Sequence, residues 1–365
     1  MFKKIALFLL LLLLLPTSSS AQEQPKEEMF KARVIEIMQQ EEVIDEAGSI
    51  IQQDLKLKGL EGNFKNQEII FEGINDWQIL SSQVYKEGDK VIVSYSQDIE
   101  GNDVFFVLDY DRSSPILWLT IIFILSVLAI GRWKGLRSLL ALIASFIVIL
   151  KFIIPQILNG ANPVMISVIG AIIILIFAIY FTQGINKKAH IANLALIISL
   201  LFTALLSFWF TKLAQLTGYS EEASYLMNIN QGNLNLQGLL LAGILIGTLG
   251  VLDDVIISQV STVEQLKQAN PQLSNRQIYV RSLKVGIDHI TSMINTLFFA
   301  YAGASLPLLI LFTQSDVSGL NFFQIINNEL ITTEIIRTLL GSIGIVLSIP
   351  IANYLASYFL KIKRE

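Results

Sequence analysis

The chain has 365 residues, of which 53% are hydrophobic and 15% are charged, and its formal net charge is -4. Soluble proteins carry nearer a quarter charged residues, so this composition predicts an integral membrane protein in contact with the lipid bilayer. The small net charge and the lack of a basic tract argue against a nucleic-acid partner. The chain has no cysteine, and its two histidines are His190 and His289. Disulfide frameworks, thiolate metal sites and a histidine-rich metal centre are therefore excluded, and we expect no cofactor.

Residues 1–21 have the pattern of a signal peptide. Lys3 and Lys4 precede a leucine-rich run at 5–15, and Ser19-Ser20-Ala21 fits the small-x-small rule for cleavage. The apolar run is shorter than a membrane span. We predict that this segment is cleaved, with an uncleaved membrane anchor as the alternative.

Residues 22–113 are predicted to form a small extracytoplasmic β-rich domain. After a polar linker, five segments show the period-two alternation of strands. Glycine turns at Gly62, Gly88 and Gly101 separate some of them. The predicted strands are 30–37, 54–58, 67–71, 90–95 and 104–110. This pattern is typical of a small barrel or sandwich, OB-like in character, and we expect residues 30–112 to serve a structural role or to dock an envelope protein.

Residues 114–365 are predicted to form an all-α polytopic membrane domain with about seven transmembrane helices. Each long apolar run can cross a bilayer at 1.5 Å of rise per residue. The predicted spans are 116–131, 138–158, 163–182, 191–213, 238–260, 290–312 and 331–360.

The charged loops predict the orientation of these spans. Lysine and arginine gather in alternate loops, and the opposite loops carry acidic residues, with Lys212 as the one basic residue against the pattern. By the positive-inside rule, the basic loops and the C-terminus lie in the cytosol. This places the β-rich domain outside a bacterial cell membrane, in agreement with the predicted signal peptide.

One basic loop has helical signals of its own. Asn270-Pro271 interrupts the chain, and the capping-box pattern from Ser274 to Gln277 predicts a short helix that leads to Gly286. We interpret it as an interfacial connector, with a gate as the alternative.

Small and polar residues share one face of the fifth predicted span. At helical spacing they form a stripe that allows close helix approach and holds a carboxylate away from lipid. The stripe consists of Gly247, Gly250, Asp254, Ser258 and Ser261. Asp253 lies on a more apolar face. Asp254 is therefore the stronger candidate for function, and Asp253 is a candidate for another helix interface.

The sixth predicted span begins with a second group of polar residues. Asp288, Ser292 and Asn295 share a face, and His289 lies on the adjoining face. Both spans enter these stretches near the cytosolic side, so Asp254 is expected to lie near Asp288 and His289. Such oxygen ligands suit a hard cation, and with His289 they suit a proton relay. The identity of a metal is left open, as is a purely structural reading with Asp288 at headgroup level and Asp254 protonated or paired.

Three further charged residues lie within predicted spans. Glu334 and Arg337 are spaced i, i+3 and are expected to pair. Lys151 is deep in the second span and either extends to the interface or meets an acidic partner. We interpret all three as structural rather than as transport residues.

Several strings in this order resemble the YibE/F family of bacterial multipass membrane proteins. They are Gly247-Thr-Leu-Gly-Val-Leu-Asp-Asp-Val-Ile-Ile-Ser-Gln, Val285-Gly-Ile-Asp-His-Ile and Ala300-Tyr-Ala-Gly-Ala-Ser-Leu-Pro, with Gly131-Arg-Trp-Lys-Gly-Leu-Arg and Gly341-Ser-Ile-Gly. The resemblance covers nearly the whole chain. It implies the membrane architecture described above and implies no particular activity.

Three classes of function remain after these observations. The leading hypothesis is a transporter or permease that uses intramembrane acidic residues to couple an inorganic ion or a small solute. The alternative is an envelope scaffold or sensor whose exported domain docks a partner. An enzyme is third, because the chain has no phosphate-binding loop, no Gly-x-Ser-x-Gly elbow and no HExxH motif.

Overall fold

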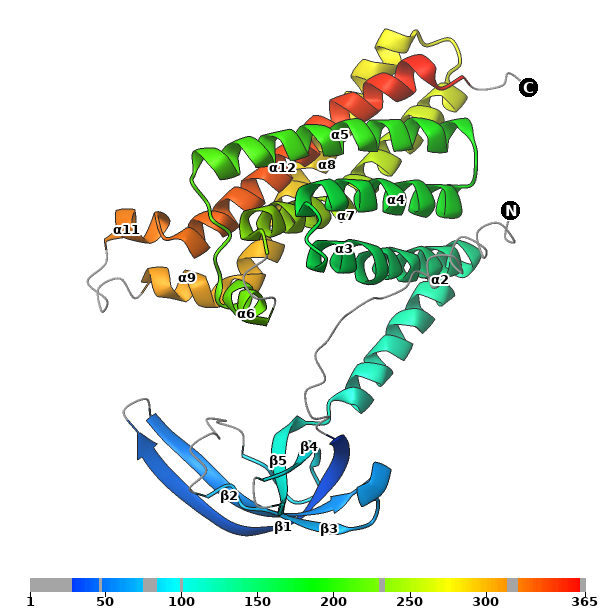
Figure 1. The fold of residues 1–365 in the computed structure, drawn as a ribbon. Helices are drawn as coiled ribbons and strands as arrows, with labels where there is room; N and C mark the ends of the chain where they lie inside the picture. Colours follow the sequence, from blue (N-terminus) through cyan, green and yellow to red (C-terminus); the bar gives the residue numbers. More distant parts are fainter. Residues whose placement is uncertain are drawn as a thin grey trace. The chain divides into compact units, whose positions relative to one another are not determined.

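The computed structural model describes residues 28–45, 48–74, 84–98, 101–229, 234–313 and 321–361. The described residues form two compact units, a β unit up to Ser126 and a helical unit from Val127 onward. Figure 1 shows the strands of the first and the long helices of the second. The predicted signal peptide at 1–21 lies outside the described residues.

The β unit is a small half-barrel built from one five-stranded antiparallel sheet. Its strands are β1 (Glu28–Asp45), β2 (Gly48–Gly59), β3 (Glu68–Phe71), β4 (Lys90–Gln97) and β5 (Asp103–Tyr110), in the order β3-β2-β1-β4-β5. All five predicted strands are confirmed. Register shifts near Val34 and Ile37 interrupt the β1–β2 ladder, and such bulges bend a strand and increase its twist.

The alternation read from the sequence accounts for the core of the half-barrel. Phe30, Ala32 and Val34 point inward from β1 and are at most 2% exposed, and Leu55 and Leu57 do the same from β2. The turn glycines Gly62, Gly88 and Gly101 all have positive φ, which costs glycine less than any other residue.

One polar side chain is buried inside the β unit. Gln53 accepts a hydrogen bond from the backbone N–H of Tyr85 at 2.7 Å and donates one to its carbonyl at 3.0 Å. Its amide therefore pairs the chain at Tyr85 as a neighbouring strand would.

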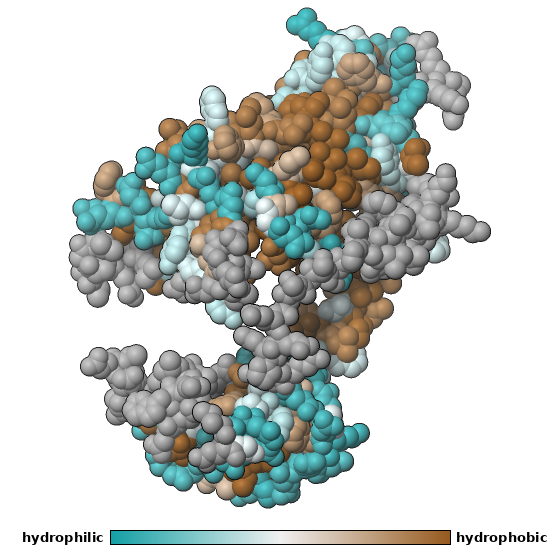
Figure 2. Space-filling view, viewed as in Figure 1, coloured by the Kyte–Doolittle hydropathy of each residue, from teal (hydrophilic) through white to brown (hydrophobic). Residues whose placement is uncertain are grey.

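The helical unit contains five helices that are long and apolar enough to cross a membrane. They are the run from α2 (Ser113–Val148) through η2 (Ile149–Ile153) to α3 (Ile154–Leu158), α4 (Pro163–Gln183), α5 (Lys187–Leu213), α7 (Leu236–Ala269) and α12 (Glu329–Phe359). Shorter or more polar helices are α6 (Glu221–Ile229), α8 (Asn275–Ala304), α9 (Leu306–Thr313) and α11 (Phe322–Ile326). Hydrophobic residues cover much of the visible surface of this unit, whereas hydrophilic residues prevail on the β unit (Figure 2).

Two features explain why five such helices are found where about seven were predicted. The first two predicted spans form one helical run, interrupted only at Arg132, whose φ of 46° and ψ of -129° are not helical. The sixth predicted span is divided between α8 and α9, and the polar residues of α8 keep it outside the apolar class.

Two predictions of helix ends need correction. The capping box of Ser274 and Gln277 is confirmed, but the helix that it starts continues through Gly286 to Ala304. Pro350 does not break the last helix, which runs on to Phe359.

Helix α12 is the centre of the helical unit. It packs against α5, α7 and α8, and α4 packs against α5 and α7. The close approach depends on glycine: a Cβ at Gly344 would lie 2.7 Å from the Thr203 hydroxyl oxygen of α5. A Cβ at Gly286 of α8 would lie 2.5 Å from Ile349 of α12.

Candidate polar site on helices α7 and α8

Two adjacent carboxylates lie near the middle of α7. Asp253 is the eighteenth of 34 residues, so about 27 Å of helix precedes it at 1.5 Å per residue. The hydrocarbon core of a bilayer is about 30 Å thick. In a helix that crosses the membrane, this position is well inside the apolar layer.

The two carboxylates have different surroundings. Asp254 is exposed, in line with the exposed glycines Gly247 and Gly250 of the predicted stripe, and Ser258 is half-buried. Asp253 is half-buried, and its Oδ1 atom is buried with no hydrogen-bond partner among the described residues. The sequence pointed to Asp254, and the structure makes Asp253 the more enclosed of the two.

The structure brings Asp254 of α7 and His289 of α8 within electrostatic reach of each other. The other predicted residues of α8, namely Asp288, Ser292 and Asn295, are exposed on that helix. Within the described ranges, no three acidic or histidine side chains are arranged to hold a metal ion. What the two helices assemble is therefore a carboxylate–imidazole pair, which suits proton exchange, bordered by hydroxyl and amide groups.

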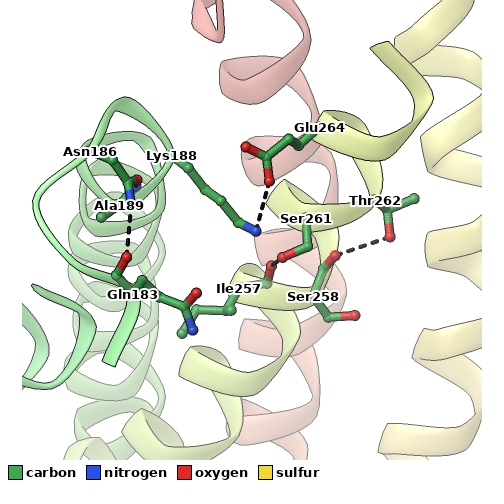
Figure 3. Close-up of polar contacts among 9 residues, drawn as sticks. All are labelled: Gln183, Asn186, Lys188, Ala189, Ile257, Ser258, Ser261, Thr262 and Glu264. Atoms are coloured by element: carbon green, nitrogen blue, oxygen red, sulfur yellow. Dashed lines mark hydrogen bonds and ion pairs between the residues drawn. The ribbon is translucent and has the colours of Figure 1, made fainter. Parts of the chain in front are cut away.

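The cytosolic end of α7, as predicted from the charges, is fixed by an ion pair. Lys188 of α5 and Glu264 of α7 lie 2.9 Å apart (Figure 3). One turn before this pair, the hydroxyl of Ser261 donates to the Ile257 carbonyl at 2.7 Å and that of Thr262 donates to the Ser258 carbonyl at 3.0 Å. The protons of these hydroxyls are therefore used within the helix, and their lone pairs remain as acceptors.

A second polar group lies toward the other end of the same helices. The predicted pair of Glu334 and Arg337 is confirmed, with 2.8 Å between the charged atoms, and Arg337 Nε is buried without a partner among the described residues. Tyr301 of α8 is in electrostatic reach of both, and its hydroxyl would lie 2.9 Å from a Cβ at Gly247. Polar groups therefore recur along the α7–α8 seam on both sides of Asp254.

Lys151 is remote from this description. It is exposed in the π-helical turn η2 and forms no ion pair with any residue that the structure describes. Of the two predicted arrangements, exposure without an acidic partner is the one observed.

Sequence reasoning missed a buried amide pair. Asn353 of α12 donates from Nδ2 to Oε1 of Gln259 of α7 at 3.2 Å, and both side chains are fully buried. The Gln259 Nε2 and Asn353 Oδ1 atoms have no partner in the described part of the chain. Gly286 of α8 lies against this pair, because its Cβ would meet Gln259 Oε1 at 3.0 Å. The available signal was one amide in each of two long apolar segments, since buried amides require partners.

A family model described as YibE/F-like protein matches residues 119–362. The chain belongs to the YibE/F-like family. The match covers the helical unit from α2 onward, including Asp253, Asp254, His289 and the amide pair. Comparison of this YibE/F-like protein with curated proteins and with solved structures found no match.

Proposed function

We propose that this YibE/F-like protein is a membrane transporter or permease in which Asp254 and His289 exchange a proton or a small cation during transport. The observation that carries the proposal is the meeting of a carboxylate and an imidazole from two helices at membrane depth. Keeping a charged residue at the centre of a membrane helix costs about 2.5–3.5 kcal/mol on insertion scales, so such residues are retained for a purpose.

A purely structural role would leave the carboxylates paired. Neither Asp253 nor Asp254 is within 4 Å of a cationic side chain in the described residues. By contrast, Glu264 and Glu334, which we regard as structural, each have a basic partner. This difference within the same unit favours a titrating role for Asp254.

The proposal includes an orientation. The β unit lies outside the cell membrane, and the ends of α5, α7 and α12 that hold Lys188, Lys267 and Leu360 lie in the cytosol. The helical run from α2 to α3 has 46 residues, or about 69 Å, and Gly135 approaches the Val127 carbonyl so closely that a Cβ would lie 2.5 Å from it. We propose that this run crosses the membrane twice by turning at Arg132 and that α8 also crosses, which brings five helices to seven crossings.

Ion flux into proteoliposomes tests this proposal. The purified full chain is reconstituted, a proton or sodium gradient is imposed, and internal pH is followed with a trapped dye. We expect flux in the wild type and at least a tenfold loss in Asp254→Asn and His289→Gln. The matched control is Glu264→Gln, which makes the same chemical change ten residues along α7 and should retain flux. Equal flux in Asp254→Asn and the wild type would contradict the proposal.

The scaffold or sensor hypothesis is retained as a second candidate because of one feature of the β unit. The β1–β2 hairpin remains paired from Ala32–Gly59 to Asp45–Gly48 and exposes Met38 and Val43. Such apolar residues on a projecting hairpin are suited to a protein partner. Replacement of Met38 and Val43 by serine should abolish the cellular phenotype under this hypothesis and leave it intact under the transport hypothesis.

A further inference from the structure

One face of α7 carries glycines that the fold of a single chain does not require. Gly243, Gly247 and Gly250 are exposed, and no described atom lies within 4 Å of a Cβ built at Gly243 or Gly250. At Gly247 the only such atom is the Tyr301 hydroxyl oxygen, at 2.9 Å. Gly344 and Gly286, by contrast, have neighbours that a Cβ would strike. Glycine in a helix interior costs about 0.8–1.0 kcal/mol relative to alanine, so the exposed glycines of α7 need a reason outside the single chain.

The same face continues into polar groups that lipid does not solvate. Asp254 follows the glycines on α7, and Asp288, Ser292 and Asn295 are exposed on the neighbouring α8. Exposed carboxylates and amides at membrane depth must meet protein or water, because hydrocarbon offers them no partner. We call the glycines of α7 with these four polar residues the α7–α8 face.

We propose that the α7–α8 face packs against the same face of a second copy of this chain. Gly243 and Gly247 form the G-x-x-x-G spacing through which membrane helices of like sequence approach each other closely. A two-fold interface is self-complementary, so a flat glycine surface on one copy meets the same surface on the other. The face also holds both a carboxylate, Asp254, and an imidazole, His289, so that two copies related by a two-fold axis offer each other opposite charges.

The first helical arm of α2 fits this face less well by its chemistry. Between residues 114 and 126 it is apolar apart from Thr120 and Ser126, and both hydroxyls donate to carbonyls of their own helix. It therefore has no free donor for Asp254 or Asp288. A second copy supplies both glycine and polar groups in matching positions, and it shields Asp254 from lipid.

Cysteine cross-linking in native membranes tests the second copy directly. The chain has no cysteine, so a single introduced thiol gives an unambiguous signal. We expect Gly250→Cys, oxidised with copper phenanthroline, to give a band at twice the 40.7 kDa mass of one chain. The matched control is Leu205→Cys, an equally exposed position on α5 that should stay monomeric. The absence of a dimer band from Gly250→Cys, an equal band from Leu205→Cys, or a band of another mass would overturn the proposal.

A second variant separates assembly from folding. Leucine at Gly243 has open space in the single chain but would obstruct close approach of a second copy. Adding Gly243→Leu to Gly250→Cys should lower the cross-linked fraction at least fivefold and leave the monomer's elution volume in detergent unchanged. An unchanged cross-linked fraction would contradict the interface. The inference does not rest on transport, since cross-linking reports assembly whether or not the protein carries an ion.

Discussion

The β unit and the helical unit treat buried polar groups in opposite ways. In the β unit, the buried amide of Gln53 is used at both ends by the backbone of Tyr85. In the helical unit, Asn193, Gln259 and Asn353 are as deeply buried and keep polar atoms without partners. All described residues with such atoms lie in the helical unit. Polar burial therefore completes the fold of the β unit, whereas in the helical unit it leaves hydrogen-bonding capacity unused between helices.

Close packing is the feature on which the helical unit depends most, and Gly344 tests it. Gly344→Val would place a side chain against Thr203 at the junction of α5, α7 and α12, and overpacking of this kind costs about 1–3 kcal/mol or more. We expect the largest fall in melting temperature in detergent from this variant. Gly250→Val adds the same side chain at an exposed site of α7 and should leave the melting temperature of the monomer nearly unchanged. Equal losses in the two variants would show that the inner and outer glycines do not differ.

The amide pair tests whether polar burial in the helical unit contributes to stability. In Gln259→Leu, Asn353 loses its only hydrogen bond to a described residue, and a stranded buried group costs about 1–3 kcal/mol. The double variant Gln259→Leu/Asn353→Leu removes both amides and should be more stable than either single variant. Gln272→Leu, on an exposed loop, is the control. A double variant that loses the sum of the two single losses would show that the pair is not coupled.

Gln53 tests the opposite behaviour in the β unit. Gln53→Leu leaves the N–H and carbonyl of Tyr85 without their partner, and we expect a loss of about 2 kcal/mol. Hydrogen exchange of the full chain, followed by mass spectrometry, should show faster exchange around residues 84–93. The exposed Gln97 is a control whose replacement by leucine should not change this exchange. Unchanged protection in Gln53→Leu would mean that the amide only fills space.

The smallest expected effect is a pH dependence in the β unit. Burial, together with the nearby carboxylate of Asp109, raises the pKa of Tyr85 to about 12. The neutral phenol is then favoured in the folded unit, so its contribution to stability is complete below the ordinary pKa of about 10 and is lost as the pH rises through 12. Absorbance at 295 nm should show one late tyrosine that is missing in Tyr85→Phe. Loss of this stability below pH 10 would contradict the assignment.

Sequence patterns predicted the local features well because local rules govern them. Alternation identified the five strands, the capping box identified the start of α8, and i, i+3 spacing identified the Glu334–Arg337 pair. The bend at Arg132 was missed because no proline or glycine occupies that residue. The Gln259–Asn353 pair joins residues 94 apart, and only the packing of α12 on α7 brings them together. The exposed side of α8 was likewise a matter of packing, since its polar residues fit an inward or an outward face equally well.

The most direct test of the central claim is the thermal stability of the detergent-solubilised protein across pH and a panel of inorganic cations, compared with Asp254→Asn. A ligand that binds only the folded state raises stability by about 2.7 kcal/mol at a hundredfold excess over its dissociation constant. If Asp254 exchanges a proton or cation, the wild type will show a selective rise in melting temperature with pH or with one cation, and Asp254→Asn will not. The same response in both proteins, or a variant that is merely destabilised with no response in the wild type, would make Asp254 a structural carboxylate.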